Sequence, residues 1–180
     1  MPSSTLAAMP ILHIARATQG DTAILCALGA QTFRETYYPI SNPTEVDEYA
    51  DGHFRPDDIA GWLAAREAIT LVARVDGVPI GYAHVLREAV PACVADREAV
   101  KLSRIYLLAS AHGQGHGKAL FEAALAAAVE LGARSVFLGV YDRNVKAIAF
   151  YEAHGFATVG THEFEFGGMI YHDPVMARAL

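Results

Sequence analysis

Three glycines, Gly113, Gly115 and Gly117, stand at alternate positions directly before an Ala- and Leu-rich stretch with helical spacing. Backbone N–H groups at the start of a helix have no partner within it, and glycine leaves them unshielded, so such a run can bind an anion. The P-loop pattern G-x-x-x-x-G-K-[ST] does not match, because Gly113 and Gly117 lie one residue too close and Ala119 follows Lys118. The dinucleotide pattern G-x-G-x-x-G also fails. The run predicts an anion site, with a simple tight turn as the alternative.

The histidines are numerous enough that a metal site has to be considered. The chain has eight, but the glycines between His112 and His116 predict a loop, in which their spacing defines no common face. His162 and His172 have no Cys, Asp or Glu ligands at zinc-site spacing. We therefore expect no metal site.

Length and composition limit the classes to which the protein can belong. The 180 residues predict one domain over 1–180, with 1–9 as a poorly ordered tail. A net charge of −6 with 14 Lys and Arg argues against nucleic-acid binding, and no apolar run reaches the roughly 18 residues of a membrane span. Cys26 and Cys93 form no Cys-x-x-Cys pair, which favours a reducing, cytoplasmic setting and disfavours an acyl-cysteine intermediate.

The elements that must position the glycine run alternate between helix and strand patterns. Asp76-Gly77 predicts a hairpin turn, because both central positions need positive φ. Asp21 is expected to cap the first helix, and a Pro opens each of the next two. The order predicts an α/β class with a mixed sheet. Strands are expected at 10–17, 68–75, 78–86, 99–108 and 134–140 and in a final pair, 156–166 and 169–180, about Gly167-Gly168; helices are expected at 20–38, 42–54, 55–68, after the glycine run, and at 144–155.

Two motifs in this frame resemble the signatures of the GNAT superfamily of acyl-CoA-dependent N-acyltransferases. The family's glycine motif, Arg or Gln, two residues, Gly, one residue, Gly or Ala, falls on His112, Gly115 and Gly117. His112 stands where the family usually has Arg or Gln. The resemblance covers almost the whole chain. The second motif, Asn, a small residue and an aromatic-Tyr pair before a Gly-Phe turn, falls on Asn144, Ala147, Phe150, Tyr151, Gly155 and Phe156.

The resemblance implies the GNAT fold, a mixed and mostly antiparallel central sheet flanked by helices, with acetyl-CoA as the cosubstrate. It implies that the glycine segment holds the pyrophosphate, and that the pantetheine arm pairs like an added strand with the preceding strand, where the sheet splays. The residues assigned to the cofactor in this way are Leu107, Leu108, His112, Gly113, Gln114, Gly115, His116, Gly117, Lys118, Asn144, Ala147 and Tyr151.

Tyr151 is the residue to which the resemblance gives a chemical role. A phenol near the thioester sulfur can protonate the departing thiolate, although a tyrosine on an apolar helix face can equally be a packing residue. An acceptor amine must lose a proton before it attacks, and Glu35 and His84 are the candidate bases. Arg104 and Tyr106 are candidates to orient a water in the same step.

The acceptor is the least constrained part of the prediction. The chain looks similar to the PaiA-type polyamine acetyltransferases, and acidic residues on its first two long helices, Glu35, Glu45, Asp47 and Glu48, would attract a small cationic amine. The prediction is direct acetyl transfer to a primary amine within a ternary complex. A protein N-terminal or lysine acetyltransferase and a non-catalytic acyl-CoA sensor are the alternatives. The sequence leaves the oligomeric state open, a homodimer included.

Overall fold

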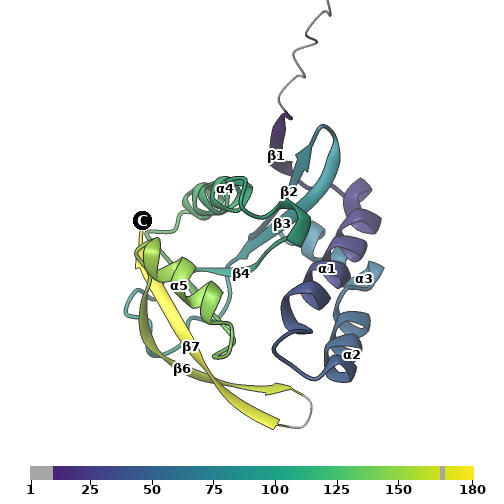
Figure 1. Cartoon of the computed structure of the whole chain (residues 1–180). Coiled ribbons are helices and arrows are strands. Elements are labelled where there is room, and N and C mark those ends of the chain that lie inside the picture. The colour runs from purple at the N-terminus through teal and green to yellow at the C-terminus, as the bar shows by residue number, and fades with distance from the viewer. Residues whose placement is uncertain (1–9, 167–168) are drawn as a thin grey trace, which may run out of the picture.

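The computed structural model describes residues 10–166 and 169–180, so the expectations for the tail 1–9 and for Gly167-Gly168 lie outside it. Seven strands form one sheet in the order β1-β2-β3-β4-β5-β7-β6 (Figure 1). All neighbouring pairs are antiparallel except β4 and β5, which are parallel. This is the mixed, mostly antiparallel sheet that the family resemblance implies.

The described elements follow the predicted order closely. The strands are β1 (Leu12–Arg16), β2 (Ala68–Val75), β3 (Val78–Leu86), β4 (Val100–Leu107), β5 (Ser135–Gly139), β6 (Ala157–Phe166) and β7 (Met169–Ala179). The helices are α1 (Thr22–Tyr37), α2 (Pro43–His53), α3 (Pro56–Ala64), α4 (His116–Glu130) and α5 (Val145–Ala153), with short 3-10 turns η1 (Gln19–Asp21) and η2 (Ala109–Ala111). No helix in the described part of the chain has both the length and the apolar character needed to cross a membrane.

Local chemistry explains most element ends. Asp76 and Gly77 adopt φ values of 49° and 83°, which confirms the hairpin turn between β2 and β3. The helices α2 and α3 begin at Pro43 and Pro56, as predicted, and the Asn42 side chain caps α2 by accepting a hydrogen bond from the Thr44 N–H at 3.0 Å.

The prediction that the Asp21 side chain caps α1 is wrong. Asp21 does occupy the position before the helix, but its side chain makes no capping hydrogen bond to α1. One carboxylate oxygen accepts from the Thr18 N–H at 2.8 Å, and the other accepts from Arg74 of β2 at 2.5 Å. These bonds lower the pKa of Asp21, and the hydrogen bond from the Thr18 N–H has the largest effect.

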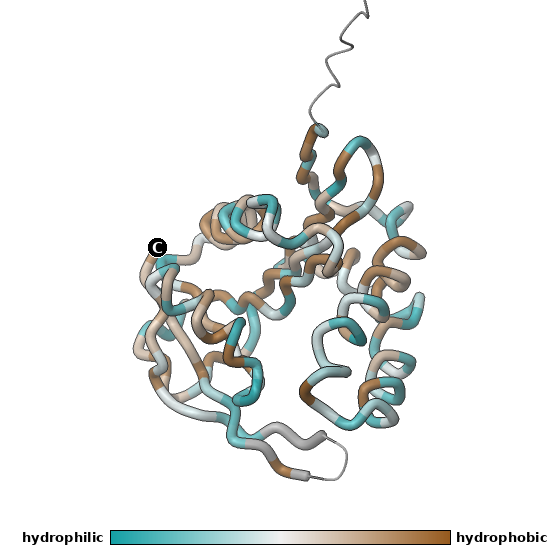
Figure 2. Tube along the Cα trace, in the orientation of Figure 1, coloured by the Kyte–Doolittle hydropathy of each residue, from teal (hydrophilic) through white to brown (hydrophobic). Residues whose placement is uncertain are grey.

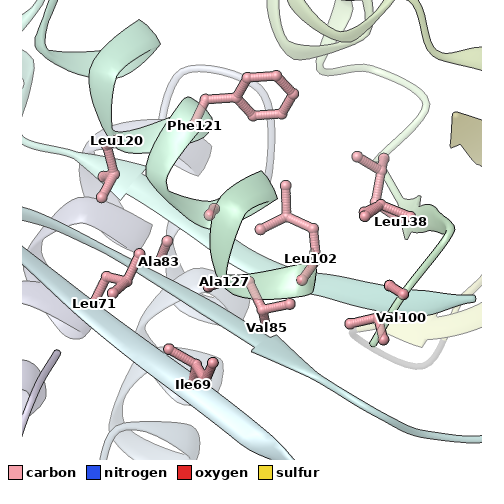
Figure 3. Packing of buried hydrophobic residues seen from close by; sticks show 14 of the residues in the cluster. Ile69, Leu71, Ala83, Val85, Val100, Leu102, Leu120, Phe121, Ala127 and Leu138 are labelled. Carbon is pink, nitrogen blue, oxygen red and sulfur yellow. The ribbon is translucent and has the colours of Figure 1, made fainter. Parts of the chain in front are cut away.

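Helix α4 covers one face of the sheet and builds the main core. Its small and apolar side chains, including Leu120, Phe121 and Ala127, lie against residues of the central strands such as Leu71 and Val85 (Figure 3). Small residues along α4 allow the helix to approach the strands closely. This packing fixes the start of α4, where the glycine run lies.

Helices α1, α2 and α3 cover the opposite face (Figure 1). Apolar and polar residues alternate around these helices in Figure 2, as expected where one side of a helix is buried. Aromatic rings join aliphatic side chains in this contact, with Phe33 stacked on Tyr49 at a centroid distance of 4.5 Å. Gly29 is required here, because a Cβ at this position would lie 2.1 Å from the Phe54 ring. Both faces of the sheet are therefore buried, one under α4 and the other under α1 to α3.

Candidate active site

Strands β4 and β5 separate along their length. Their parallel pairing is confined to Val100 with Val136 and Lys101 with Phe137, although β4 continues to Leu107. Past these pairs the described sheet has a gap, with β3 still bonded to the other edge of β4. An unpaired strand edge can accept an added extended chain, which is the geometry that a pantetheine arm requires.

The backbone at the end of β4 shows which group faces the gap. The Leu108 N–H donates to the Ile80 carbonyl of β3 at 2.8 Å, so it is not available to a cofactor, and the prediction that Leu108 pairs with pantetheine needs correction. Because successive residues of a strand direct their backbone groups to opposite edges, the Leu107 N–H points toward the gap. Leu107 is therefore the member of the pair that suits the predicted contact.

The glycine run forms a left-handed turn that leads into α4. Gly113 and Gly115 have φ values of 76° and 81°, a region that residues with a Cβ adopt at a cost. Gly115 is the residue before the helix, so the N–H groups of His116, Gly117 and Lys118 lie in the first turn of α4. A Cβ at Gly113 or Gly115 would meet open space, which leaves room for a ligand beside the turn.

Side chains from the same run fold back and stiffen it. His112 Nε2 donates to the Leu107 carbonyl at 3.0 Å, and Gln114 Nε2 donates to the Ser110 carbonyl at 3.3 Å. His112 thus ties the loop to the end of β4. Nδ1 of His116 is buried without a hydrogen-bond partner among the described residues, which is unfavourable unless a ligand supplies one. The unshielded N–H groups and this ring nitrogen fit an anionic pyrophosphate.

Helix α5 brings the second predicted motif to the other side of the gap. The Asn144 side chain accepts from the Ala147 N–H at 3.2 Å and caps the helix, which confirms the capping interpretation of this residue. Tyr151 packs its ring against Phe121 and Phe156 at centroid distances of 6.3 and 5.7 Å. Burial raises the pKa of the Tyr151 phenol, with a further contribution from Tyr106, so the phenol keeps its proton at neutral pH.

A cavity of about 260 Å³ opens on the aromatic side of the gap. It takes residues from the diverging ends of both β4 and β5, together with α1, α2 and the β6–β7 pair. Tyr37 and Tyr106 meet in its wall, with their hydroxyl oxygens 3.4 Å apart, and burial raises the pKa of both phenols. The residues that line it are Phe33, Tyr37, Ser41, Tyr49, Lys101, Ser103, Arg104, Tyr106, Gly139, Tyr141, His162 and Asp173.

A bulge in β4 shapes this cavity. The register between β3 and β4 shifts after His84, which pairs with Arg104, whereas Val85 pairs with Leu102. The extra residue lets the consecutive side chains of Ser103 and Arg104 both line the cavity, which a regular strand would place on opposite faces. The sequence analysis did not identify this bulge, because no Gly or Pro marks it.

Asp173 and His162 are site residues that the sequence analysis missed. They are paired across β6 and β7, so their side chains lie on the same face of the sheet, and both line the cavity. Asp173 is only 5% exposed, and burial raises the pKa of its carboxyl, although its Oδ1 accepts from the Asp142 N–H at 3.2 Å. A Cβ at Gly139 would lie 2.5 Å from His162 Cε1, so glycine there makes room for the imidazole. The signal in the sequence was an Asp in the interior of a predicted strand, next to Pro174 and Val175.

The two predicted bases lie elsewhere. Glu35 accepts hydrogen bonds from Gln31 Nε2 at 2.9 Å and from the Ala109 N–H at 2.8 Å, so it anchors the chain between β4 and the glycine run. His84 is 3% exposed and stacks on Trp62, with Nδ1 2.8 Å from Thr70 Oγ1. Burial lowers its pKa to about 4. Neither Glu35 nor His84 lines the cavity, so the structure does not support either as the base.

The two cysteines lie away from the cavity. Cys26 lies in α1, where burial raises the pKa of its thiol, and Cys93 packs its side chain where a Cβ at Gly160 would be. Neither thiol lines the cavity. Among residues 10–166 and 169–180, no three His, Cys, Asp or Glu side chains gather closely enough to hold a metal ion.

The sheet with its gap, the glycine turn and the cavity define an acetyltransferase domain, and the comparisons with known proteins agree. The profile of the acetyltransferase (GNAT) family matches residues 31–156. An uncharacterised N-acetyltransferase of Mycobacterium bovis is 35% identical over 160 residues, covering 89% of this chain and 98% of that protein. Another from Lactobacillus delbrueckii subsp. lactis is 26% identical over 169 residues, covering 94% and 98%. The chain therefore belongs to the GNAT family and is an N-acetyltransferase.

Solved structures support the fold. The PaiA N-acetyltransferase of Thermoplasma acidophilum, crystallised in complex with coenzyme A, superposes with a TM-score of 0.76 at 18% identity, covering 94% of this chain and 99% of that one. A GCN5-related N-acetyltransferase from Rhodopseudomonas palustris gives a TM-score of 0.74 at 18% identity, covering 99% and 100%.

Proposed function

We propose that the protein transfers an acetyl group from acetyl-CoA to a small primary amine by direct attack, with both substrates bound together. The observation that carries this proposal is the position of the cavity, which opens on the gap between β4 and β5 whose end leads into the glycine turn. A donor held along Leu107 and an acceptor in the cavity would therefore meet in the gap. Bound acetyl-CoA would supply a thioester carbonyl as the electrophile.

The cofactor side of the gap would be held mainly by backbone groups. The N–H groups from Gly113 to Lys118 would bind the pyrophosphate, and the Leu107 N–H would pair with the pantetheine arm. Partial positive charge at the start of α4 allows a protein of net charge −6 to bind an anion at this point. Asn144 and Ala147 hold the start of α5 beside the gap.

Proton transfer would use groups on both sides of the gap. An amine with a pKa of about 10 is protonated at neutral pH, so a base must accept its proton before attack. Asp173 suits this task, because its raised pKa makes it a better proton acceptor than a solvated carboxylate and His162 lies beside it. Tyr151 would then donate its phenolic proton to the sulfur as the carbon–sulfur bond breaks.

The cavity favours a small acceptor over a peptide. Its volume of about 260 Å³ lies near the lower end of ligand pockets, whereas a protein acetyltransferase needs an extended groove for a peptide backbone. The acids predicted to attract a polyamine do not line it: Asp47 is bonded to Arg34 and Tyr38, and Glu35 to the Ala109 N–H. The polyamine prediction thus gains no support from the cavity.

A thiol-release assay tests the proposal. The protein is incubated with acetyl-CoA and a panel of amino acids, amino acid amides, polyamines, aminoglycosides and short peptides, and free coenzyme A is measured against a control without amine. We expect release that depends on a small amine. Tight acetyl-CoA binding with no release for any amine would instead support a non-catalytic sensor.

A further inference from the structure

Arg104 brings a positive charge to the cavity without a carboxylate to balance it. Among the side chains that the structure places, no Asp or Glu lies within 4.0 Å of its guanidinium. Lys101, the other cation in the wall, is already paired with Glu88 at 2.7 Å. A half-buried charge without a counterion is costly, so Arg104 would gain from an anionic ligand.

The guanidinium of Arg104 is held in place by aromatic neighbours. Its central carbon lies 5.1 Å from the centre of the Phe54 ring and 5.0 Å from that of Trp62, and Nη2 donates to Tyr49 Oη at 3.4 Å. These contacts use the faces of the guanidinium and one of its five N–H groups. The bulge in β4 directs the side chain into the cavity. A fixed, planar group with free N–H donors suits a carboxylate, which it can bind through two parallel hydrogen bonds.

The opposite charge enters the cavity from a different part of the fold. Asp173 and His162 come from β6 and β7, whereas Arg104 contacts residues of α2 and α3 and the turn between them. Figure 1 shows the β6–β7 pair and the three helices on opposite sides of β4. The cavity therefore offers a cation beside the helices and a proton acceptor beside the β6–β7 pair. A polyamine would place a second positive charge near Arg104, with no anion to pair with it.

We propose that the acceptor is a small primary amine that also carries a carboxylate, and that Arg104 binds this carboxylate while the amine lies toward Asp173. The proposal rests on the acetyl transfer proposed above and names its acceptor class. Free amino acids and their carboxamides are the matched probes, because each pair differs only in the anionic group.

The first experiment compares kcat/KM for free amino acids and for their carboxamides. The wild-type protein should favour the acids by at least tenfold. Arg104→Gln should lower kcat/KM for the acids by about 10-fold to 100-fold, the usual range for a hydrogen bond to a charged group, and change the carboxamide values by less than about threefold. For Arg104→Lys, kcat/KM for the acids should lie between the values of the wild type and Arg104→Gln. Lysine keeps the positive charge but cannot donate two parallel hydrogen bonds to a carboxylate. Arg55→Gln is the control, since Arg55 pairs with Asp58 outside the cavity.

A binding measurement separates the two proposals. Calorimetry with coenzyme A present should show amino acids binding to the wild-type protein, with affinity lost in Arg104→Gln and carboxamides binding weakly to both. If amines are acetylated but acids and carboxamides react equally, the carboxylate site is wrong while acetyl transfer stands. If no amine is acetylated, acetyl transfer is wrong, and calorimetry then decides the Arg104 site: selective acid binding supports it, and equal or absent binding overturns it.

Discussion

At the scale of single residues, Tyr151 separates an enzyme from a protein that only binds the cofactor. Tyr151→Phe keeps the ring that packs against Phe121 and Phe156 and removes the hydroxyl alone. If the phenol protonates the departing sulfur, kcat should fall by about 10²-fold to 10⁴-fold, while acetyl-CoA affinity and melting temperature stay nearly unchanged. The measurement is kcat at saturating acetyl-CoA with the best amine found.

The control for this variant is Tyr38→Phe, which removes a hydroxyl bonded to Asp47 on the surface of α1 and α2. It should leave kcat unchanged. A fall of less than about threefold for Tyr151→Phe, under conditions where chemistry limits the rate, would assign Tyr151 to core packing.

Asp173 gives a second prediction, in which stability and activity move differently. Burial raises the pKa of Asp173 in the folded state, so the fold favours the protonated form, and stability from this group is lost as pH rises through the folded pKa. Asp173→Asn removes the charge and can keep the bond from the Asp142 N–H. The variant should be at least as stable as the wild type at pH 7, yet its kcat should fall by about 10²-fold or more.

The pH dependence of kcat/KM tests independently whether Asp173 acts as the base. The wild-type kcat/KM should fall on the acid side as Asp173 becomes protonated, and Asp173→Asn should lack that limb. Asp57→Asn removes an exposed charge on α3 that does not line the cavity, and this variant should behave like the wild type. Full activity of Asp173→Asn would remove Asp173 from the mechanism.

At the scale of elements, the glycine turn and the start of α4 determine cofactor binding. Gly117 is the position to test, because Gly115 has a φ of 81° and a valine there would strain the turn itself. Gly117 is helical and the nearest atom to a Cβ would be Leu107 Cδ2 at 4.0 Å, so valine should fit the free protein. Gly117→Val should crowd the bound pyrophosphate and weaken acetyl-CoA binding by about tenfold or more in calorimetry.

Gly61→Val is the matched control, since Gly61 lies within α3 and a Cβ there would meet open space. It should bind acetyl-CoA like the wild type. Unchanged affinity in a folded Gly117→Val protein would mean that the anion binds elsewhere.

The elements were largely predictable from the sequence because each carries its own local signal. The Asp76-Gly77 turn, Pro43 and Pro56 at helix starts, and the positive φ of Gly155 after α5 all depend on near neighbours in the chain. The separation of β4 from β5 and the bulge at Ser103 depend on how distant strands pair. Their residues look like those of any regular strand, so local patterns do not show them.

Of the candidate site, only the glycine turn and the helix after it carried such a local signal. The glycine turn and the start of α4 are continuous in the chain, so the motif located them, while their role in cofactor binding stays a prediction. The Leu108 N–H is bonded to β3. The acceptor side joins Arg104, Asp173 and His162 from separate strands, so it forms only when the sheet does. Glu35 and His84 were plausible bases by residue type. In the structure both are held outside the cavity by hydrogen bonds that the sequence does not reveal.

At the scale of the whole molecule, His84 makes stability depend on pH in a definite window. Its folded pKa of about 4 lies below its ordinary value of 6.5, so the unfolded chain binds the proton more readily between these values. Stability from neutral His84 is therefore present above about pH 6.5 and is lost as pH falls toward 4. The shift corresponds to roughly 3 kcal/mol. Carboxylates with lowered pKa, such as Asp21, titrate below this window and contribute little within it. The raised pKa of Asp173 changes stability in the opposite direction, but Asp173 is present in every variant compared, so the difference from His84→Gln isolates the histidine.

Urea unfolding between pH 7 and pH 4.5 tests this, with His84→Gln as the variant and His13→Gln as an exposed control. The wild type and His13→Gln should lose most of this free energy of unfolding over the range. His84→Gln should be less stable at pH 7, because a buried ring and its Thr70 contact are lost, but its stability should change much less with pH. It should also keep its kcat, since His84 lies outside the cavity. An equally steep loss in His84→Gln would place the acid-sensitive group elsewhere in the fold, and a large fall in kcat would return His84 to the active site.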